Sequence, residues 1–263
     1  MACAVALVAV GVVALAVAAA HARDATVLRG FTGLYGASVD AEIRVIAQAV
    51  DPLPYAFLGA LCLAVAVVRH RMRTAVAVAI ALVGSGLTAQ ALKHLLGQAR
   101  YYPWLPGDSM ANGWPSGHAT AAMTLALCAV VVAPAAWRAA VALFACGCTI
   151  SIAFATLALT WHFPSDVLAG LLVGGLWVSG TLAALGRLGG AAPAAARPPL
   201  LPVVVLIGTC GAVVAAALVA AASARVRLDA VDTASAVAGA LVIAGVTLAL
   251  AVAVAVAAPE EER

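Results

Sequence analysis

Residues that could handle a phosphate group stand in three short clusters of an otherwise apolar chain. Lys93 is followed by Arg100 seven residues later, and His162 is followed by Asp166 four residues later. Between these pairs lies the tetrapeptide Pro-Ser-Gly-His at positions 115–118. Because burying an ionisable group in a membrane is costly, such residues in an apolar chain are the first candidates for a functional site.

The clusters provide the groups that hold a phosphate during phosphoryl transfer. Lys93 offers a point charge, and Arg100 offers a planar fork suited to two phosphate oxygens. Ser116 and Gly117 open a predicted helix, where unpaired backbone N–H groups and the helix dipole favour an anion. Gly117 also lets a phosphate approach the backbone closely.

Two histidines can divide the remaining work. A neutral imidazole can attack phosphorus, while an imidazolium can protonate a leaving alkoxide, and His118 and His162 suit this pair of roles. Asp166 can hold one ring nitrogen of His162 and fix its tautomer. Taken singly, Lys93 would be a snorkelling residue and Ser116 an ordinary helix cap. The functional interpretation therefore depends on all the clusters meeting at one face.

Membrane-spanning helices must position these clusters. The 263-residue chain is 65% hydrophobic and only 10% charged, which excludes an ordinary soluble domain. A helix needs roughly 20 apolar residues to cross a bilayer, and about eight stretches approach that length. We therefore predict an all-α, polytopic transmembrane bundle with spans at residues 2–20, 54–68, 74–96, 118–137, 139–161, 166–186, 203–222 and 235–258.

The order of the spans predicts one common face for the clusters. Each intervening span crosses the membrane in full, so the third and fifth spans end where the fourth and sixth begin. Arginine in short loops favours the cytoplasm, and the densest group is Arg69, Arg71 and Arg73. We expect that loop and both chain ends to be cytoplasmic, which places the site on the outer face of the cell membrane.

Composition divides the chain into a core and an appendage. Residues 1–188 form a six-span core that holds the chemistry, residues 189–202 form a linker, and residues 203–263 hold two further spans and an acidic tail. The last two spans consist of small apolar residues, so we expect a packing role or a homo-oligomer there. In the long loop at 21–51, apolar spacing over 41–50 predicts a short helix on the membrane surface.

The remaining residue types favour simpler interpretations. The six cysteines lie inside apolar runs and are interpreted as packing residues, so we predict no metal site and no cofactor. We expect membrane lipids as neighbours and no nucleic-acid partner. We interpret the aromatic residues near the clusters as an interfacial belt, namely Tyr101, Tyr102, Trp104, Trp114, Trp161 and Phe163.

The clusters resemble the motifs of the type 2 phosphatidic acid phosphatase superfamily, which read K-x6-R-P, P-S-G-H and S-R-x5-H-x3-D. The tract HFPSDVLAG at 162–170 is especially similar, and the resemblance covers roughly residues 54–186. The resemblance implies that His162 is the nucleophile and forms a phosphohistidine, with Asp166 as its orienting partner and His118 as the acid. It also implies a six-helix, metal-free enzyme acting on a lipid phosphate or pyrophosphate, with phosphate held by Lys93, Arg100, Ser116 and Gly117.

Two departures from the motifs keep alternatives open. Tyr101 replaces the proline of the first motif, and Ala155-Thr156 replaces Ser-Arg in the third. Loss of a phosphate-binding arginine removes about 2 to 4 kcal/mol of transition-state stabilisation. One alternative is a noncatalytic transporter or lipid-binding protein that kept the fold. A second alternative is an enzyme that transfers phosphate between lipids, with water access to the phosphohistidine as the deciding property.

Overall fold

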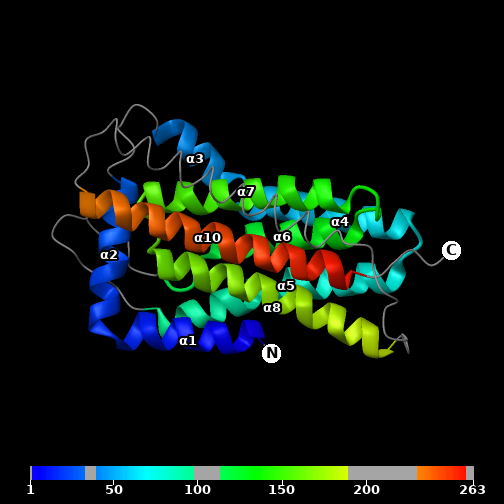
Figure 1. Ribbon diagram of the computed structural model, residues 1–263. Coiled ribbons are helices and arrows are strands. Elements are labelled where there is room, and N and C mark those ends of the chain that lie inside the picture. The colour runs from blue at the N-terminus through cyan, green and yellow to red at the C-terminus, as the bar shows by residue number, and fades with distance from the viewer. Residues whose placement is uncertain (1, 33–39, 98–112, 189–229, 259–263) are drawn as a thin grey trace.

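The computed structural model describes residues 2–32, 40–97, 113–188 and 230–258 (Figure 1). Within these ranges the chain is helical and contains no strand. The helices are α1 (Ala2–Ala16), α2 (Ala18–Thr32), α3 (Asp40–Gln48), α4 (Pro52–Val68), α5 (Met72–Leu96), α6 (Gly117–Val132), α7 (Arg138–Ala158), α8 (Pro164–Leu188) and α10 (Ala230–Ala257). The predicted all-α bundle is confirmed.

Four of the described helices, α5, α7, α8 and α10, are long and apolar enough to cross a membrane, which makes the chain a multi-pass membrane protein. They correspond to the predicted spans at 74–96, 139–161, 166–186 and 235–258. The count rises to six if the bent pairs α1–α2 and α3–α4 each form one span. At 16 residues α6 is shorter, about 24 Å long. The predicted span at 203–222 and the linker at 189–202 lie outside the described residues.

The N-terminal region differs from the prediction. The helix predicted over 2–20 ends at Ala16, the chain turns by 94°, and α2 occupies part of the predicted loop. Leu28 and Phe31, three residues apart on α2, are fully buried. They form a small apolar face on an otherwise polar helix, and this face packs into the protein and anchors the segment. Figure 1 shows α2 running across one end of the bundle.

α6 lies at the centre of the bundle and contacts α4, α5, α7, α8 and α10. Small residues let α8 approach it, because a Cβ added at Gly170 would lie 2.5 Å from the Ser116 carbonyl oxygen. Polar side chains inside α6 are bonded within the bundle. Thr124, for example, donates to the carbonyl oxygen of Thr120 at 2.7 Å and lies 3.0 Å from the Ser85 hydroxyl of α5.

The described residues of the predicted clusters lie at one end of the bundle. α5 and α7 end there, and α6 and α8 begin there, as the order of spans predicts (Figure 1). α3 packs against the same end of α7, where Ile43 and Ala47 bury their side chains against Ala155. The helix predicted at 41–50 is therefore present, but part of its apolar side packs on α7.

Candidate active site

The start of α6 joins two of the clusters. Ser116 is its N-cap and accepts the backbone N–H of Ala119 at 3.3 Å, as expected for a serine at a helix start. The N–H of Ser116 donates to the Asp166 carbonyl oxygen at 2.8 Å, which fixes the second cluster against the third. A cis peptide bond precedes Pro115. The amides that could bind an anion thus lie beside the start of α8.

Lys93 brings positive charge to the start of α6 from the last turn of α5. A Cβ added at Gly117 would lie 3.6 Å from the Lys93 ammonium nitrogen, so this nitrogen lies over the helix N-terminus. Its charge also acts on Asp166 and His118. Arg100, the second predicted cation, lies outside the described residues.

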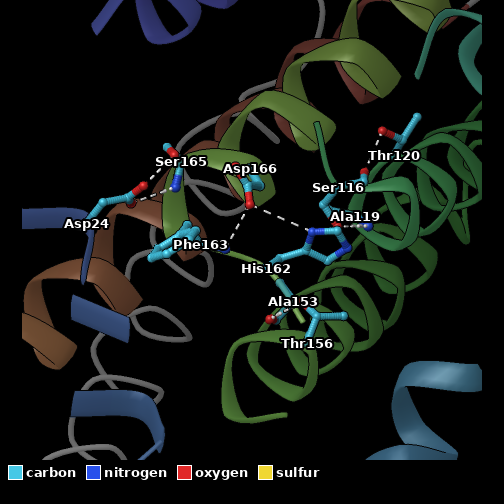
Figure 2. A network of polar contacts seen from close by, with 10 residues as sticks. All are labelled: Asp24, Ser116, Ala119, Thr120, Ala153, Thr156, His162, Phe163, Ser165 and Asp166. Atoms are coloured by element: carbon cyan, nitrogen blue, oxygen red, sulfur yellow. Dashed lines mark hydrogen bonds and ion pairs between the residues drawn. The ribbon is translucent and has the colours of Figure 1, made fainter. Parts of the chain in front are cut away.

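His162 and Asp166 form a buried pair between α7 and α8, with side chains only 7% and 1% exposed (Figure 2). The distance from His162 Nδ1 to Asp166 Oδ2 is 3.8 Å, which is ion-pair range but longer than a hydrogen bond. Asp166 Oδ2 also accepts the Phe163 N–H at 2.9 Å. A Cβ at Gly113 would lie 2.5 Å from the same oxygen, so the Gly113 backbone covers the carboxylate.

A tight turn sets the position of His162. After α7 ends, Thr160 adopts a φ of 58° and the Trp161 N–H donates to the Thr156 carbonyl oxygen at 3.0 Å. α8 then begins at Pro164, where the missing N–H costs no helical hydrogen bond. Asp24 of α2 accepts the Ser165 N–H at 3.0 Å and contacts its hydroxyl, as Figure 2 shows.

His118 faces both His162 and a second carboxylate. The two imidazole rings lie with centroids 6.1 Å apart and an interplanar angle of 61°. His118 Nε2 lies 3.3 Å from Asp51 Oδ1 at the start of α4. The His118 ring also lies 5.3 Å from the Trp161 ring, over which the Arg44 guanidinium sits at 5.6 Å. The predicted site residues that the structure describes therefore meet at one place.

Comparison with known proteins identifies the central part of the chain. Residues 74–189 match the family model of the PAP2 superfamily. This part of the chain belongs to the PAP2 superfamily. The resemblance predicted from the three clusters is confirmed, and membership supports a phosphoric ester hydrolase. No curated protein and no solved structure matches the chain.

Sequence reasoning missed two acids that contact the PAP2 site, Asp24 and Asp51, both of which precede the matched residues. The order of the spans places the residue before the second span on the same face as the clusters, and that signal could have pointed to Asp51. The pairing itself is invisible in the sequence, because 67 residues separate Asp51 from His118.

The belt interpretation is wrong for two of its aromatic residues. Trp114 is 4% exposed and Phe163 is 1% exposed, so both belong to the protein interior. Trp114 packs with Ala14 and Ala169, where α1 meets α8. Trp161 is partly exposed beside His118. Tyr101, Tyr102 and Trp104 lie outside the described residues.

Thr156 occupies the place of the PAP2 motif arginine and is fully buried. Its hydroxyl donates to the Ala153 carbonyl oxygen at 2.8 Å, so its proton is already used within α7. The hydroxyl is thus directed to the backbone of its own helix, and we interpret Thr156 as a spacer that leaves room where the motif has an arginine.

Among the described residues, no group of three or more His, Cys, Asp or Glu side chains is arranged to hold a metal ion. In the same part of the chain Cys62, Cys128 and Cys146 are buried free thiols, as expected for packing residues, and Cys148 is exposed. Cys210 lies outside it.

Proposed function

We propose that this PAP2 protein is a lipid phosphatase that hydrolyses a lipid phosphate or pyrophosphate through a phosphohistidine on His162. One observation carries the proposal. The His162 ring lies between a carboxylate on its Nδ1 side, at 3.8 Å, and a second imidazole whose centroid is 6.1 Å away. This arrangement provides an oriented nucleophile beside a proton donor, and Lys93 supplies positive charge next to both.

The first chemical step forms the phosphoenzyme. The Asp166 carboxylate lies on the Nδ1 side of His162 and favours the tautomer with Nδ1–H, which leaves the Nε2 lone pair free to attack phosphorus. A P–N bond forms, the P–O bond to the lipid breaks, and His118 gives its proton to the leaving oxygen. Lys93 and the amides at the start of α6 stabilise the charge on the phosphate oxygens, and Arg100 is proposed to share this role.

The second step returns the enzyme to its starting state. Neutral His118 takes a proton from water as the water oxygen attacks phosphorus, and the P–N bond breaks with its electron pair returning to His162 Nε2. Inorganic phosphate leaves, and His118 is again protonated. Every group that acts in this cycle belongs to the chain, so no metal step is needed.

The location of the site supports a lipid substrate. The clusters lie at one end of a bundle of apolar helices, where a lipid tail can stay in the bilayer while its phosphate reaches Lys93 and His162. A polyprenyl or phosphatidic acid type of lipid fits this placement. We place the site on the outer face of the cell membrane, because the arginines at the other end of the bundle, Arg69, Arg71 and Arg73, favour the cytoplasm. Reporter fusions at the C-terminus and in residues 98–112 should then report opposite sides.

Phosphate release by the purified protein in detergent tests the function. Phosphatidic acid, a polyprenyl phosphate and a polyprenyl pyrophosphate are compared as substrates, with His162→Ala as the inactive control. We expect release from at least one lipid by wild type alone, unaffected by EDTA and inhibited by vanadate, which can mimic pentacoordinate phosphorus. Activity that survives in His162→Ala, or that EDTA abolishes and added metal restores, contradicts the mechanism.

The noncatalytic alternative is favoured by one observation, the buried threonine in place of the motif arginine. Tight binding of a lipid phosphate without turnover, equal in wild type and His162→Ala, would support it. Phosphate transfer between lipids is distinguished by adding a lipid alcohol as acceptor, because a transferase yields the phosphorylated acceptor in place of free phosphate.

A further inference from the structure

Asp51 occupies a helix N-cap but does not act as a cap. It directly precedes α4, whose first residue is Pro52, and an aspartate at this position usually accepts a backbone N–H of its own helix. The Asp51 side chain makes no such hydrogen bond. Its carboxylate instead reaches across to α6, where Oδ1 lies 3.3 Å from His118 Nε2.

The backbone around Asp51 holds this orientation. The Asp51 N–H donates to the Gln48 carbonyl oxygen at 3.0 Å, and the Asp51 carbonyl oxygen accepts the Tyr55 N–H at 2.9 Å. The preceding residue, Val50, is buried at 7% exposure, and α3 is anchored on α7 through Ile43 and Ala47. The bend of 44° between α3 and α4 therefore fixes the carboxylate over the site.

The contact gives the two nitrogens of His118 different surroundings. Nε2 faces the carboxylate, so Nδ1 is the nitrogen left to exchange a proton. Burial of the ring opposes the positive form of His118 most, and among the described residues the charged or titratable groups His162 and Lys93 oppose it too. Asp166 faces His162 and Lys93. Asp51 is thus the group that favours an imidazolium at this place.

We propose that Asp51 is a positioning residue that holds Nε2–H of His118, so that Nδ1 alone passes the proton to the leaving group and retrieves it from water. This inference rests on the proposed function, because it assigns Asp51 a part in the same proton transfers. Asp51 precedes the residues that match the PAP2 family, so the role belongs to the segment that this chain places in front of the family core.

The decisive experiment is the pH profile of kcat for Asp51→Asn on the lipid phosphate that wild type hydrolyses. Without the carboxylate, imidazolium His118 is less stabilised and loses its proton at lower pH. We therefore expect the alkaline limb to move down by about one pH unit, a modest shift because the Asp51 carboxylate is 42% exposed. At alkaline pH kcat should therefore fall by up to about tenfold, the most that a shift of one pH unit gives for a single proton, with a much smaller loss at acid pH.

Leaving-group dependence gives an independent reading of the same role. 4-Nitrophenyl phosphate releases a weakly basic phenolate that needs little protonation, so Asp51→Asn should retain most of the wild-type rate on it. In the His118→Gln background, Asp51→Asn should cause no further loss of kcat, because a residue that acts only through His118 has no effect once His118 is removed. Asp51→Glu, which keeps the charge, should restore part of the alkaline limb.

Matched controls separate this role from a structural one. Glu42→Gln removes the same charge from an exposed position on α3 and should leave the profile unchanged. A uniform loss for Asp51→Asn at every pH and on both substrates overturns the positioning role, and so does an additive loss in the double variant. If Asp51→Asn does not fold, the pH profile of kcat for Asp51→Glu decides between the two roles. A shifted alkaline limb supports the positioning role, and a uniform loss at every pH overturns it. Inactive wild type would instead refute the proposed function.

Discussion

Each histidine of the site faces a carboxylate, but the two pairs have different surroundings. His162 and Asp166 are 7% and 1% exposed, and their closest atoms are 3.8 Å apart. His118 and Asp51 are 24% and 42% exposed, and their closest atoms are 3.3 Å apart. The buried carboxylate is also held by the Phe163 N–H, so its position is set by backbone. The second carboxylate remains open to water.

This difference in burial matches the two proposed roles. A nucleophile needs a fixed ring orientation and protection from bulk water, because its phosphorylated form must last until water is admitted in the right place. An imidazole that gives up its proton must be protonated again before the next cycle, which is easier when the ring is partly exposed to water. Unequal burial thus supports the proposed division of two chemically identical side chains into nucleophile and proton carrier.

Breaking the buried pair should have the largest effect. Asp166→Asn keeps the size of the side chain but replaces the carboxylate on the Nδ1 side of His162 with a neutral amide. The negative charge that favours the Nδ1–H tautomer is lost, so kcat should fall on the order of 10⁴-fold, as in serine-protease triads. Rapid-quench measurement should show that phosphoenzyme formation is the slowed step. A loss smaller than that of Asp51→Asn would reverse the comparison between the pairs.

Removing the cation shared by both pairs should rank second. Lys93→Ala deletes charge beside the start of α6, and kcat/KM should fall about 10²- to 10³-fold because no motif arginine compensates at position 156. Arg73→Ala, which removes an exposed cation near the other end of α5, serves as the control and should leave kcat/KM unchanged. Equal losses in the two variants would show a general charge effect and contradict phosphate binding by Lys93.

The two pairs also differ in how far sequence could predict them. His162 and Asp166 are four residues apart, so local spacing was enough to expect their contact. Ser116 was predictable as a helix start because serine favours that position. The common face of the clusters followed from counting complete crossings. Each of these predictions needs only local chemistry or the direction of the chain.

Asp51 and Asp24 needed information that local patterns do not carry. Asp24 lies 141 residues from its partner Ser165, and its position depends on α2, whose few apolar residues were interpreted as part of a loop. The approach of Asp51 to His118 depends on the bend between α3 and α4 and on the packing of α3 against Ala155. Such contacts arise from tertiary packing, which overrides local preference.

Displacing the buried carboxylate without changing its chemistry should cost less than deleting it. Gly113→Ala places a methyl group 2.5 Å from Asp166 Oδ2, so the carboxylate must move and kcat should fall by about 10²-fold. Gly86→Ala on α5 adds the same methyl group where no atom lies within 4 Å and should not change kcat. If Gly113→Ala retains full activity, the exact position of Asp166 does not limit the rate.

The smallest effect is expected from adding a cation beside the buried pair. Thr156 is fully buried and its hydroxyl donates to the Ala153 carbonyl oxygen, so we interpret it as a spacer. Thr156→Arg offers a fork to the phosphate, but burying a guanidinium offsets part of the gain. We expect about a tenfold rise in kcat/KM for phosphatidic acid, together with a fall for a polyprenyl pyrophosphate that needs the space.

Comparison with Thr156→Gln separates charge from size, because glutamine is long and neutral. A gain with arginine alone shows that the site lacks only charge, whereas equal losses with both substitutions show that space was the reason for threonine. Either outcome requires a phosphate-bearing ligand next to His162. If wild type neither binds nor hydrolyses any lipid phosphate and Thr156→Arg produces no activity, the chain keeps a PAP2 core without its chemistry, and the noncatalytic alternative replaces the enzyme.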